Sequence, residues 1–383
     1  GVHINLIAII LLTLSTTLFT NIPIIILIIF LVAMAITHTF IDYIPSVFLG
    51  APDEDTFLSI LPGHNLLLKK QGYSAIIYTL FGSITAIPLL LILFPIFIHF
   101  LNPIYPYIQS IIPYILILTS ISLIYFEKNS KLLALFIFLL SGILGIITFN
   151  ISSPQPLLPL FTGLFGTSSL ITSLIKKQKI PQQKIIKIKN LFPETRQYLK
   201  AIIASLIGAP LVSFLPGLGT GQAAVIGSEV IGDLSEKEFL IQIGAINTLV
   251  IGLSFFTLYA VDKARTGTTK AIQQLISTST TILTFNNLYY ILATILITGI
   301  IAFFLTIFLA KFFSIHIHKI NYKFLSYSII LLLTILTLLF SHFYGILILI
   351  TATALGLTCI QLNIKRTHLM GALIIPIVLL YLI

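Results

Sequence analysis

The sequence predicts an all-α fold: a polytopic bundle of transmembrane helices, about 13 spans or half-spans, arranged as two inverted-topology repeats. Apolar residues make up 57% of the 383 residues and charged residues only 8%, whereas a soluble domain carries about 25% charged residues. Apolar runs of membrane-spanning length, about 20 residues, follow one another along the whole chain. The net charge of +10 therefore indicates membrane topology and no nucleic-acid partner, because basic residues gather in the inner loops of membrane proteins.

Thirteen apolar segments are candidates for these spans. Several are shorter than a bilayer requires, so we expect some of them to be half-helices or re-entrant segments. The candidates are residues 4–19, 22–40, 73–101, 104–125, 132–150, 156–175, 198–215, 218–231, 239–259, 288–310, 324–340, 343–362 and 369–383.

A basic hydrophilic segment, residues 176–200, divides the chain into two membrane domains, residues 1–175 and 201–383. When this linker is placed in the cytoplasm and the spans alternate, all but three of the 21 Lys and Arg residues fall on the inner side, as the positive-inside rule requires. The sequence therefore predicts a multi-pass protein of the plasma membrane with a cytoplasmic linker. The exceptions form one cluster: Lys263, Arg265 and Lys270.

Two short stretches of the first domain are similar to stretches of the second. GVHINLIAII (1–10) resembles GLGTGQAAVI (217–226), and LGAPDEDTF (49–57) resembles LYAVDKART (258–266), with L-x-A-x-D in common. The copies occur in the same order, and an odd number of spans between them gives them opposite orientations. Inverted repeats of this kind are typical of secondary transporters. One more helix is expected before Gly1 to complete the first repeat.

The stretch FLPGLGTGQAAVIG (214–227) predicts a helix start that receives an anion inside the membrane. Its proline ends the preceding helix, and its glycines permit positive φ and close backbone approach. The free N–H groups of the next helix attract an anion, and in lipid they must find a partner. The alternative is a tight turn or close helix packing through small residues. The predicted substrate-binding residues are Gly1, His3, Asn5, Pro216, Gly217, Gly219, Gly221, Gln222, Arg265 and Thr266.

Three carboxylates are candidates for binding a coupling cation, Na⁺ or H⁺. Asp53 and Asp55 lie in the first copy of the L-x-A-x-D stretch, and Asp262 lies in the second. Embedded carboxylates are costly in a membrane and are commonly functional. Lys263 and Arg265 are the expected partners of Asp262. Ordinary solvated loops on either side of the membrane are the alternative.

The sequence contains no motif of an enzyme. HExxH, GxSxG and CxxC are all absent from it, so we expect neither catalysis nor a cofactor. Asn247, Thr248 and Glu229 are polar residues in apolar surroundings, and we expect each of them to form a hydrogen bond between helices.

The helix start at residues 216–221 and the run PGHNLLLKKQGYSAI (62–76) resemble the large membrane subunit of tripartite tricarboxylate transporters. The resemblance is closer to an archaeal branch of uncharacterised membrane proteins in that family. It implies an ion-coupled uptake permease for carboxylates that works with a small membrane subunit and an extracytoplasmic binding protein. Residues 53–55 are acidic where the bacterial loop is rich in Gly, Pro, Ser and Thr.

Three functions fit these features. The first is a secondary transporter for a small organic anion, with alternating access between the two repeats. The second is a translocase for a phosphate-bearing lipid head group, because helix N-termini bind phosphate as well as carboxylate; a lateral opening towards lipid would favour it. The third is a membrane scaffold without transport activity, which predicts no buried polar site beside the glycine motif.

Overall fold

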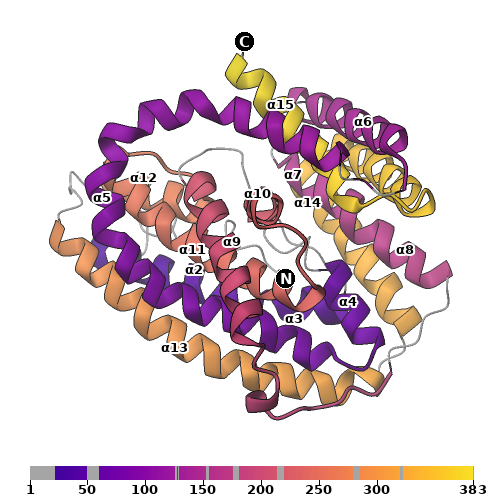
Figure 1. Ribbon diagram of the computed structural model, residues 1–383, viewed down its shortest axis with the longest axis horizontal. Coiled ribbons are helices and arrows are strands. Elements are labelled where there is room, and N and C mark those ends of the chain that lie inside the picture. The colour runs from indigo at the N-terminus through magenta and orange to yellow at the C-terminus, as the bar shows by residue number, and fades with distance from the viewer. Residues whose placement is uncertain are drawn as a thin grey trace.

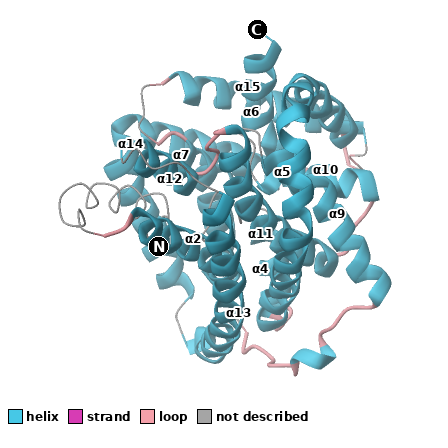
Figure 2. Cartoon of the chain, turned by 90° about the vertical axis from the view of Figure 1, so that its left-hand side faces the viewer, coloured by secondary structure: helices cyan, strands magenta, loops and turns pink. Residues whose placement is uncertain are grey.

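The computed structural model describes residues 22–49, 60–125, 127, 129–151, 155–175, 181–213, 220–278, 285–319 and 322–382. Every regular element in these ranges is a helix (Figures 1 and 2), which confirms the all-α fold. The α-helices are α2 (Ile24–Ile41), α3 (Tyr43–Leu49), α4 (Ile60–Leu68), α5 (Gly72–Tyr125), α6 (Lys131–Asn150), α7 (Leu157–Phe161), α8 (Ser168–Ile175), α9 (Thr195–Ser213), α10 (Thr220–Ile231), α11 (Glu236–Val261), α12 (Gly267–Thr278), α13 (Phe285–His316), α14 (Tyr322–Gln361) and α15 (Gly371–Leu382). Shorter elements are the π-helix η2 (Thr162–Thr167) and the 3₁₀-helices η3 (Ile188–Asn190), η4 (Ile317–Lys319) and η5 (Arg366–Met370).

Seven helical segments within the described ranges are long and apolar enough to cross a bilayer. The helices α10, α12 and α15 have 12 residues each, too few to span the bilayer alone. The seven segments are Ile24–Phe48, Gly72–Tyr107, Lys131–Asn150, Leu157–Ile175, Glu236–Val261, Asn287–His316 and Lys323–Gln361.

Helix α5 differs from the sequence prediction, which has two spans separated at Asn102 and Pro103. It is one helix of 54 residues, about 80 Å long if straight, against a hydrocarbon core of about 30 Å. Figure 1 shows that α5 curves around one side of the bundle. Each internal proline removes a backbone hydrogen bond and bends the helix, so the turn is spread along a curve. The prolines are Pro88, Pro95, Pro103, Pro106 and Pro113.

Helix α14 shows the break that the sequence predicts between residues 340 and 343. Its 40 residues are interrupted at His342, whose φ of 55° and ψ of −159° are not helical. A non-glycine residue with positive φ is uncommon, so His342 marks a sharp change of direction between two spans.

Helix α11 forms the centre of the bundle. Of the residues in its most apolar stretch, 94% are buried. It begins with a capping box, in which the Ser235 hydroxyl accepts from the Glu238 N–H and the Glu238 carboxylate accepts from the Ser235 N–H. This exchange satisfies backbone donors that a helix start leaves open. The start of α11 is therefore fixed by its own sequence.

Small residues bring α5 and α11 into backbone contact. A Cβ added to Gly82 would lie 1.9 Å from the Ile241 carbonyl oxygen, and one added to Gly244 would lie 2.0 Å from the Thr79 oxygen. The Ser83 hydroxyl donates to the Gly244 carbonyl at 3.0 Å. Helices in membranes associate through such close packing and hydrogen bonds, because lipid offers them no hydrophobic driving force.

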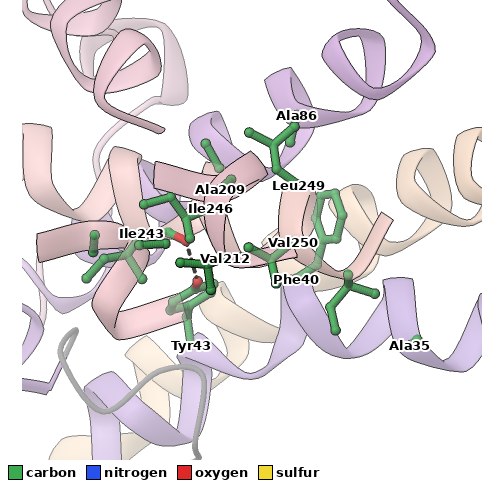
Figure 3. Packing of buried hydrophobic residues seen from close by; sticks show 14 of the residues in the cluster. Ala35, Phe40, Tyr43, Ala86, Ala209, Val212, Ile243, Ile246, Leu249 and Val250 are labelled. Atoms are coloured by element: carbon green, nitrogen blue, oxygen red, sulfur yellow. Dashed lines mark hydrogen bonds between the residues drawn. The ribbon is translucent and has the colours of Figure 1, made fainter. Parts of the chain in front are cut away.

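The C-terminal end of α2 and the start of α3 run antiparallel to the middle of α11. The Thr248 hydroxyl donates to the Thr39 hydroxyl at 3.1 Å across a separation of 209 residues. The Tyr43 hydroxyl donates to the Ile243 carbonyl at 3.0 Å, as the dashed line in Figure 3 shows. From Thr39 in α2 to Tyr43 in α3, the partner position on α11 moves back from Thr248 to Ile243. The same separation of 209 residues relates the two L-x-A-x-D stretches, so equivalent positions of the two halves touch each other.

The order of elements is also repeated. In the first half, the short helix α4 stands between the span of α2 and α3 and the long helix α5. In the second half, the short helix α12 stands between α11 and the long helix α13. The packing is exchanged accordingly: α11 packs on α5 and α4, and α2 packs on α13 and α12. Neither short helix is predicted from the sequence.

Close glycine contacts follow the same exchange. A Cβ on Gly145 of α6 would lie 1.9 Å from the Ala372 oxygen of α15, and one on Gly356 of α14 would lie 2.4 Å from the Leu164 oxygen of η2. Gly145 corresponds to Gly356, and Leu164 corresponds to Ala372. The two residues of each correspondence are about 210 positions apart in the sequence.

A second pair of contacts repeats this relation. A Cβ added to Gly371 would lie 2.3 Å from the Phe138 oxygen, and one added to Gly163 would lie 2.8 Å from the Leu349 oxygen. Gly371 and Gly163 are equivalent positions of the two halves. Reciprocal contacts of this kind are what a two-fold relation between two repeats produces.

Candidate functional site

Eight of the predicted site residues lie outside the described ranges, and the other five are placed. Gly221 and Gln222 lie in the first turn of α10, which begins at Thr220, where the glycine motif predicts a helix start. Arg265 and Thr266 precede α12, and Asp262 follows α11. The eight are Gly1, His3, Asn5, Asp53, Asp55, Pro216, Gly217 and Gly219.

Helix α10 is held firmly between α9 and α11. The Gln242 side chain donates to the Ala224 carbonyl at 2.9 Å and accepts from the Ser228 hydroxyl at 3.0 Å. A Cβ on Gly208 of α9 would lie 2.0 Å from the Ala223 oxygen, and one on Gly227 would meet α9 in return. Gly227 thus serves helix packing, the alternative considered for the whole glycine stretch. The position of the α10 N-terminus is set by rigid neighbours.

The start of α12 is capped by its own threonines. The Thr266 hydroxyl accepts from the Thr269 N–H at 3.1 Å. The Thr269 hydroxyl accepts from the N–H groups of Arg265 and Thr266 at 3.0 and 2.9 Å. Both hydroxyls satisfy backbone donors at this helix start, and the half-buried Arg265 supplies the positive charge of this corner.

Asp262 lies at the C-terminal end of α11 in a left-handed conformation, with φ of 50° and ψ of 36°. Its carboxylate and its carbonyl accept from the Gln273 side chain at 2.9 and 3.0 Å, and the residue is exposed. The Gln273 amide thus joins the end of α11 to α12.

The three polar residues expected to bond between helices divide into two groups. Thr248 does so through Thr39, and Glu229 of α10 bonds to Ser122 of α5. Asn247 is only 1% exposed, and neither its amide nitrogen nor its amide oxygen has a partner among the described residues. A buried amide without a partner costs about 2 kcal/mol or more, so Asn247 marks a polar point beside the crossing of α2 and α11.

Two ionisable residues at the end of α2 are not among the predicted site residues. Asp42 is 7% exposed, and the Nε2 atom of His38 lies 3.9 Å from its Oδ1 atom. Both lie inside the candidate span Ile24–Phe48. The sequence could have pointed to Asp42, because an acidic residue within a membrane-spanning segment is rare and commonly functional. They are close to Thr39, where the two halves touch.

A second buried polar group lies between α14 and α15. The Arg366 guanidinium is 8% exposed and donates to the carbonyls of Leu164 and Phe165 at 2.7 and 2.8 Å, and to the hydroxyls of Ser168 and Ser169 at 3.0 and 2.6 Å. Both carbonyls belong to the π-helix η2, and they also accept from the Ser168 and Ser169 hydroxyls at 2.7 and 2.6 Å. Arg366 is predicted in an inner loop, but its buried side chain anchors a neighbouring helix.

Glu127, in the loop between α5 and α6, lies beside this anchor. Its carboxylate is 2.8 Å from the His368 Nε2 atom and accepts from the N–H groups of Asn129 and Lys365. Burial by itself raises the pKa of Glu127, but the hydrogen bonds from His368 and the backbone outweigh it and hold that pKa below its usual range. The loops before α6 and before α15 are thereby joined.

Sequence comparisons agree with this architecture. Residues 1–371 match the family described as "Tripartite tricarboxylate transporter TctA family". The chain is 33% identical over 372 residues to "Uncharacterized protein MJ1079" of Methanocaldococcus jannaschii, covering 92% of this chain and 88% of that protein. No solved structure matches the chain. The chain belongs to the TctA family and is a multi-pass membrane component of a transporter, not an enzyme.

Proposed function

We propose that the protein is a secondary transporter permease for a small organic anion of the carboxylate class. Uptake is coupled to a cation, and access alternates as two inverted repeats rock against each other. The carrying observation is the exchange of contacts between the halves around the pair Thr39 and Thr248. The antiparallel crossing at this pair fits an axis in the membrane plane, as inverted repeats require.

In this proposal the anion binds at helix N-termini. The start of α10 presents the N–H groups of a first helical turn and the positive end of a helix dipole, and the helix is held rigidly by Gln242. Arg265 at the start of α12 adds a guanidinium, which pairs well with carboxylates. The matching contribution of the first half, with Gly1, His3 and Asn5, remains a proposal on residues outside the described ranges. Asp53, Asp55 and Asp262 remain proposed cation ligands.

The family description also suggests partners. A tripartite transporter has two further components, and we propose a small membrane subunit and an extracytoplasmic binding protein for this chain. The binding protein would deliver the anion to the outer face, where the model of alternating spans puts Arg265 and Lys263.

Replacing Arg265 by glutamine should lower carboxylate uptake about tenfold, because a hydrogen bond to a charged group contributes about 1.5–3 kcal/mol. Uptake of radiolabelled citrate, succinate and acetate is measured in cells that express the full chain with the two partner components. The matched control is Lys263→Gln, two residues away and exposed, which should retain uptake. The proposal fails if wild-type cells accumulate none of these carboxylates, or if both variants transport equally.

We also propose that the linker faces the cytoplasm. Its residues Gln183 and Lys184 bond to the turn between α4 and α5, so linker and turn lie on one side. A cysteine at position 189, which is exposed, should react with an impermeant maleimide only after cells are permeabilised. Gln183 itself is a poor site because it is 7% exposed.

The labelling experiment has a built-in background and a control. The natural cysteine, Cys359, is buried and should stay unlabelled in folded protein. Lys263→Cys, at the opposite end of α11, should react in intact cells. Labelling of position 189 from outside, with position 263 protected, would reverse the topology.

A further inference from the structure

An open cavity of about 440 Å³ lies on the side of the bundle where the linker docks. Its walls come from the end of α4, the turn before α5, the first turn of α9 and the start of α11. The candidate spans of α5 and α11 begin at these walls, at Gly72 and Glu236. The cavity therefore lies at the level where the helices enter the membrane.

Two lysines and one acid line this cavity: Lys69, Lys237 and Glu236. The Glu236 Oε2 atom is 3.2 Å from the Lys69 Nζ atom, and its Oε1 atom accepts from the Asn65 amide at 3.2 Å. Both carboxylate oxygens thus have a donor, and this contact uses one of the three N–H donors of the Lys69 ammonium. The Lys237 Nζ atom lies over the Tyr78 ring, 5.8 Å from its centroid. The lining side chains therefore keep a net positive charge.

The surface around the cavity is also basic. In the adjoining segments 65–71, 181–200 and 233–238, basic residues outnumber acidic residues by eight to four. The Lys184 N–H donates to the Lys70 carbonyl at 3.0 Å, so the lysines of the linker and of the turn before α5 share one surface. Basic surfaces and pockets at the ends of membrane spans attract anionic lipid headgroups.

Large apolar side chains are exposed on the same surface. Ile185 and Phe192 of the linker are 43% and 57% exposed, although they stand among lysines. The Phe192 ring lies 5.2 Å from the Phe81 ring and 5.3 Å from the Tyr198 ring, between centroids, so it is held against α5 and α9. Figure 2 shows α9 at an edge of the bundle. Lysines beside exposed apolar side chains are typical of segments that lie in the membrane interface, which favours a lipid over a soluble anion.

We propose that this cavity binds the phosphate-bearing headgroup of an anionic membrane lipid. Lys69 and Lys237 contact the phosphate as point charges, while the acyl chains lie in the bilayer beside the exposed apolar side chains. The bound lipid joins α4 of the first membrane domain to α11 of the second, where Lys69 and Glu236 already pair. The cavity is at the C-terminal end of α10 and the glycine motif is at its N-terminal end, so this site is distinct from the proposed anion site.

Tryptophan quenching tests lipid binding without transport, because the natural chain has no tryptophan. Full-length Phe192→Trp is placed in bilayers of brominated phosphatidylglycerol or brominated phosphatidylcholine, and the quenching gives the ratio of their association constants. This ratio should favour the anionic lipid about fivefold for each lysine that contacts it. Tyr290→Trp, exposed at the start of α13, is the control reporter and should show a ratio near unity. Equal ratios at the two reporters would overturn the proposal.

Lysine variants separate the cavity from a diffuse basic surface. With the Phe192→Trp reporter, Lys237→Gln should lower the ratio about fivefold, and Lys237→Arg should retain it. The matched control Lys189→Gln removes an exposed lysine of the linker and should change the ratio little, because ions screen its charge. Equal losses in Lys237→Gln and Lys189→Gln, or no loss in Lys237→Gln, would overturn the proposal.

Inorganic phosphate separates a lipid from a soluble ligand. Added at constant ionic strength, it should leave the quenching by brominated phosphatidylglycerol unchanged. Recovery of fluorescence with phosphate but not with chloride would assign the cavity to a free phosphate and overturn the lipid site. Protection of the buried Cys359 from maleimide shows that each variant is folded, and Ile185→Trp supplies a second reporter on the same surface.

Discussion

Replacing Gly82 by alanine is expected to destabilise the bundle by about 3 kcal/mol or more, because the new methyl group would overpack a crossing already in backbone contact. The added Cβ would lie 1.9 Å from the Ile241 carbonyl oxygen. Backbone atoms cannot turn aside as a side chain can, so α5 and α11 would have to separate. Their separation would also weaken the bond from Ser83 to Gly244.

The matched control is Gly299→Ala on α13. Its Cβ would lie 2.0 Å from Cδ1 of Ile87, the end of a flexible side chain that can adopt another rotamer. Thermal unfolding is followed by the reaction of a maleimide dye with Cys359, the only cysteine and a buried one. Gly82→Ala should expose Cys359 at a clearly lower temperature than Gly299→Ala. Equal unfolding temperatures would show that the α5–α11 crossing is looser than described.

Replacing Arg366 by methionine is expected to be the second large loss, about 3 kcal/mol or more, because four charge-assisted hydrogen bonds to the π-helix are lost at once. The guanidinium holds two carbonyls and two hydroxyls at the π-helix. Burial of its charge opposes this gain, but four charge-assisted bonds at about 1.5–3 kcal/mol each outweigh a desolvation cost of several kcal/mol. Arg366→Lys should fall between, since one ammonium cannot reach four acceptors in a fixed fork.

The control for this series is Arg196→Met, an exposed arginine in α9, which should unfold like wild type. Cys359 is again the reporter in each variant. If Arg366→Met were as stable as Arg196→Met, the Ser168 and Ser169 hydroxyls would suffice for the π-helix carbonyls, and the anchor would be dispensable.

Much of the fold could be predicted from the sequence where hydrophobic runs have clear ends. The break at His342 and the helix start at Thr220 follow from polar or glycine-rich interruptions. The turn within α5 could not be placed, because its five prolines are spread over the helix and none of them ends it. The short helices α4 and α12 were missed because each lies within a segment assigned to a loop.

The candidate site was harder to predict because burial depends on tertiary contacts. Lys365-Arg366 looks like a loop pair in the sequence, but Arg366 enters the space beside a π-helix that no local pattern specified. Asp42 was hidden by its apolar neighbours, and its closeness to the other half appears only when Thr39 meets Thr248. The sequence likewise does not show that the Asn247 amide has no hydrogen-bond partner among the described residues, because this depends on which side chains surround it.

The bond between Thr39 and Thr248 also limits which side chains a duplicated chain can keep at such a point. A residue that meets its own copy must be self-complementary. A hydroxyl satisfies this condition because it donates and accepts at once, so two identical threonines can bond. Two carboxylates or two ammonium groups would repel each other in the interior of the membrane. Ionisable groups are therefore confined to neighbouring positions where the copies have diverged, as His38 and Asn247 have.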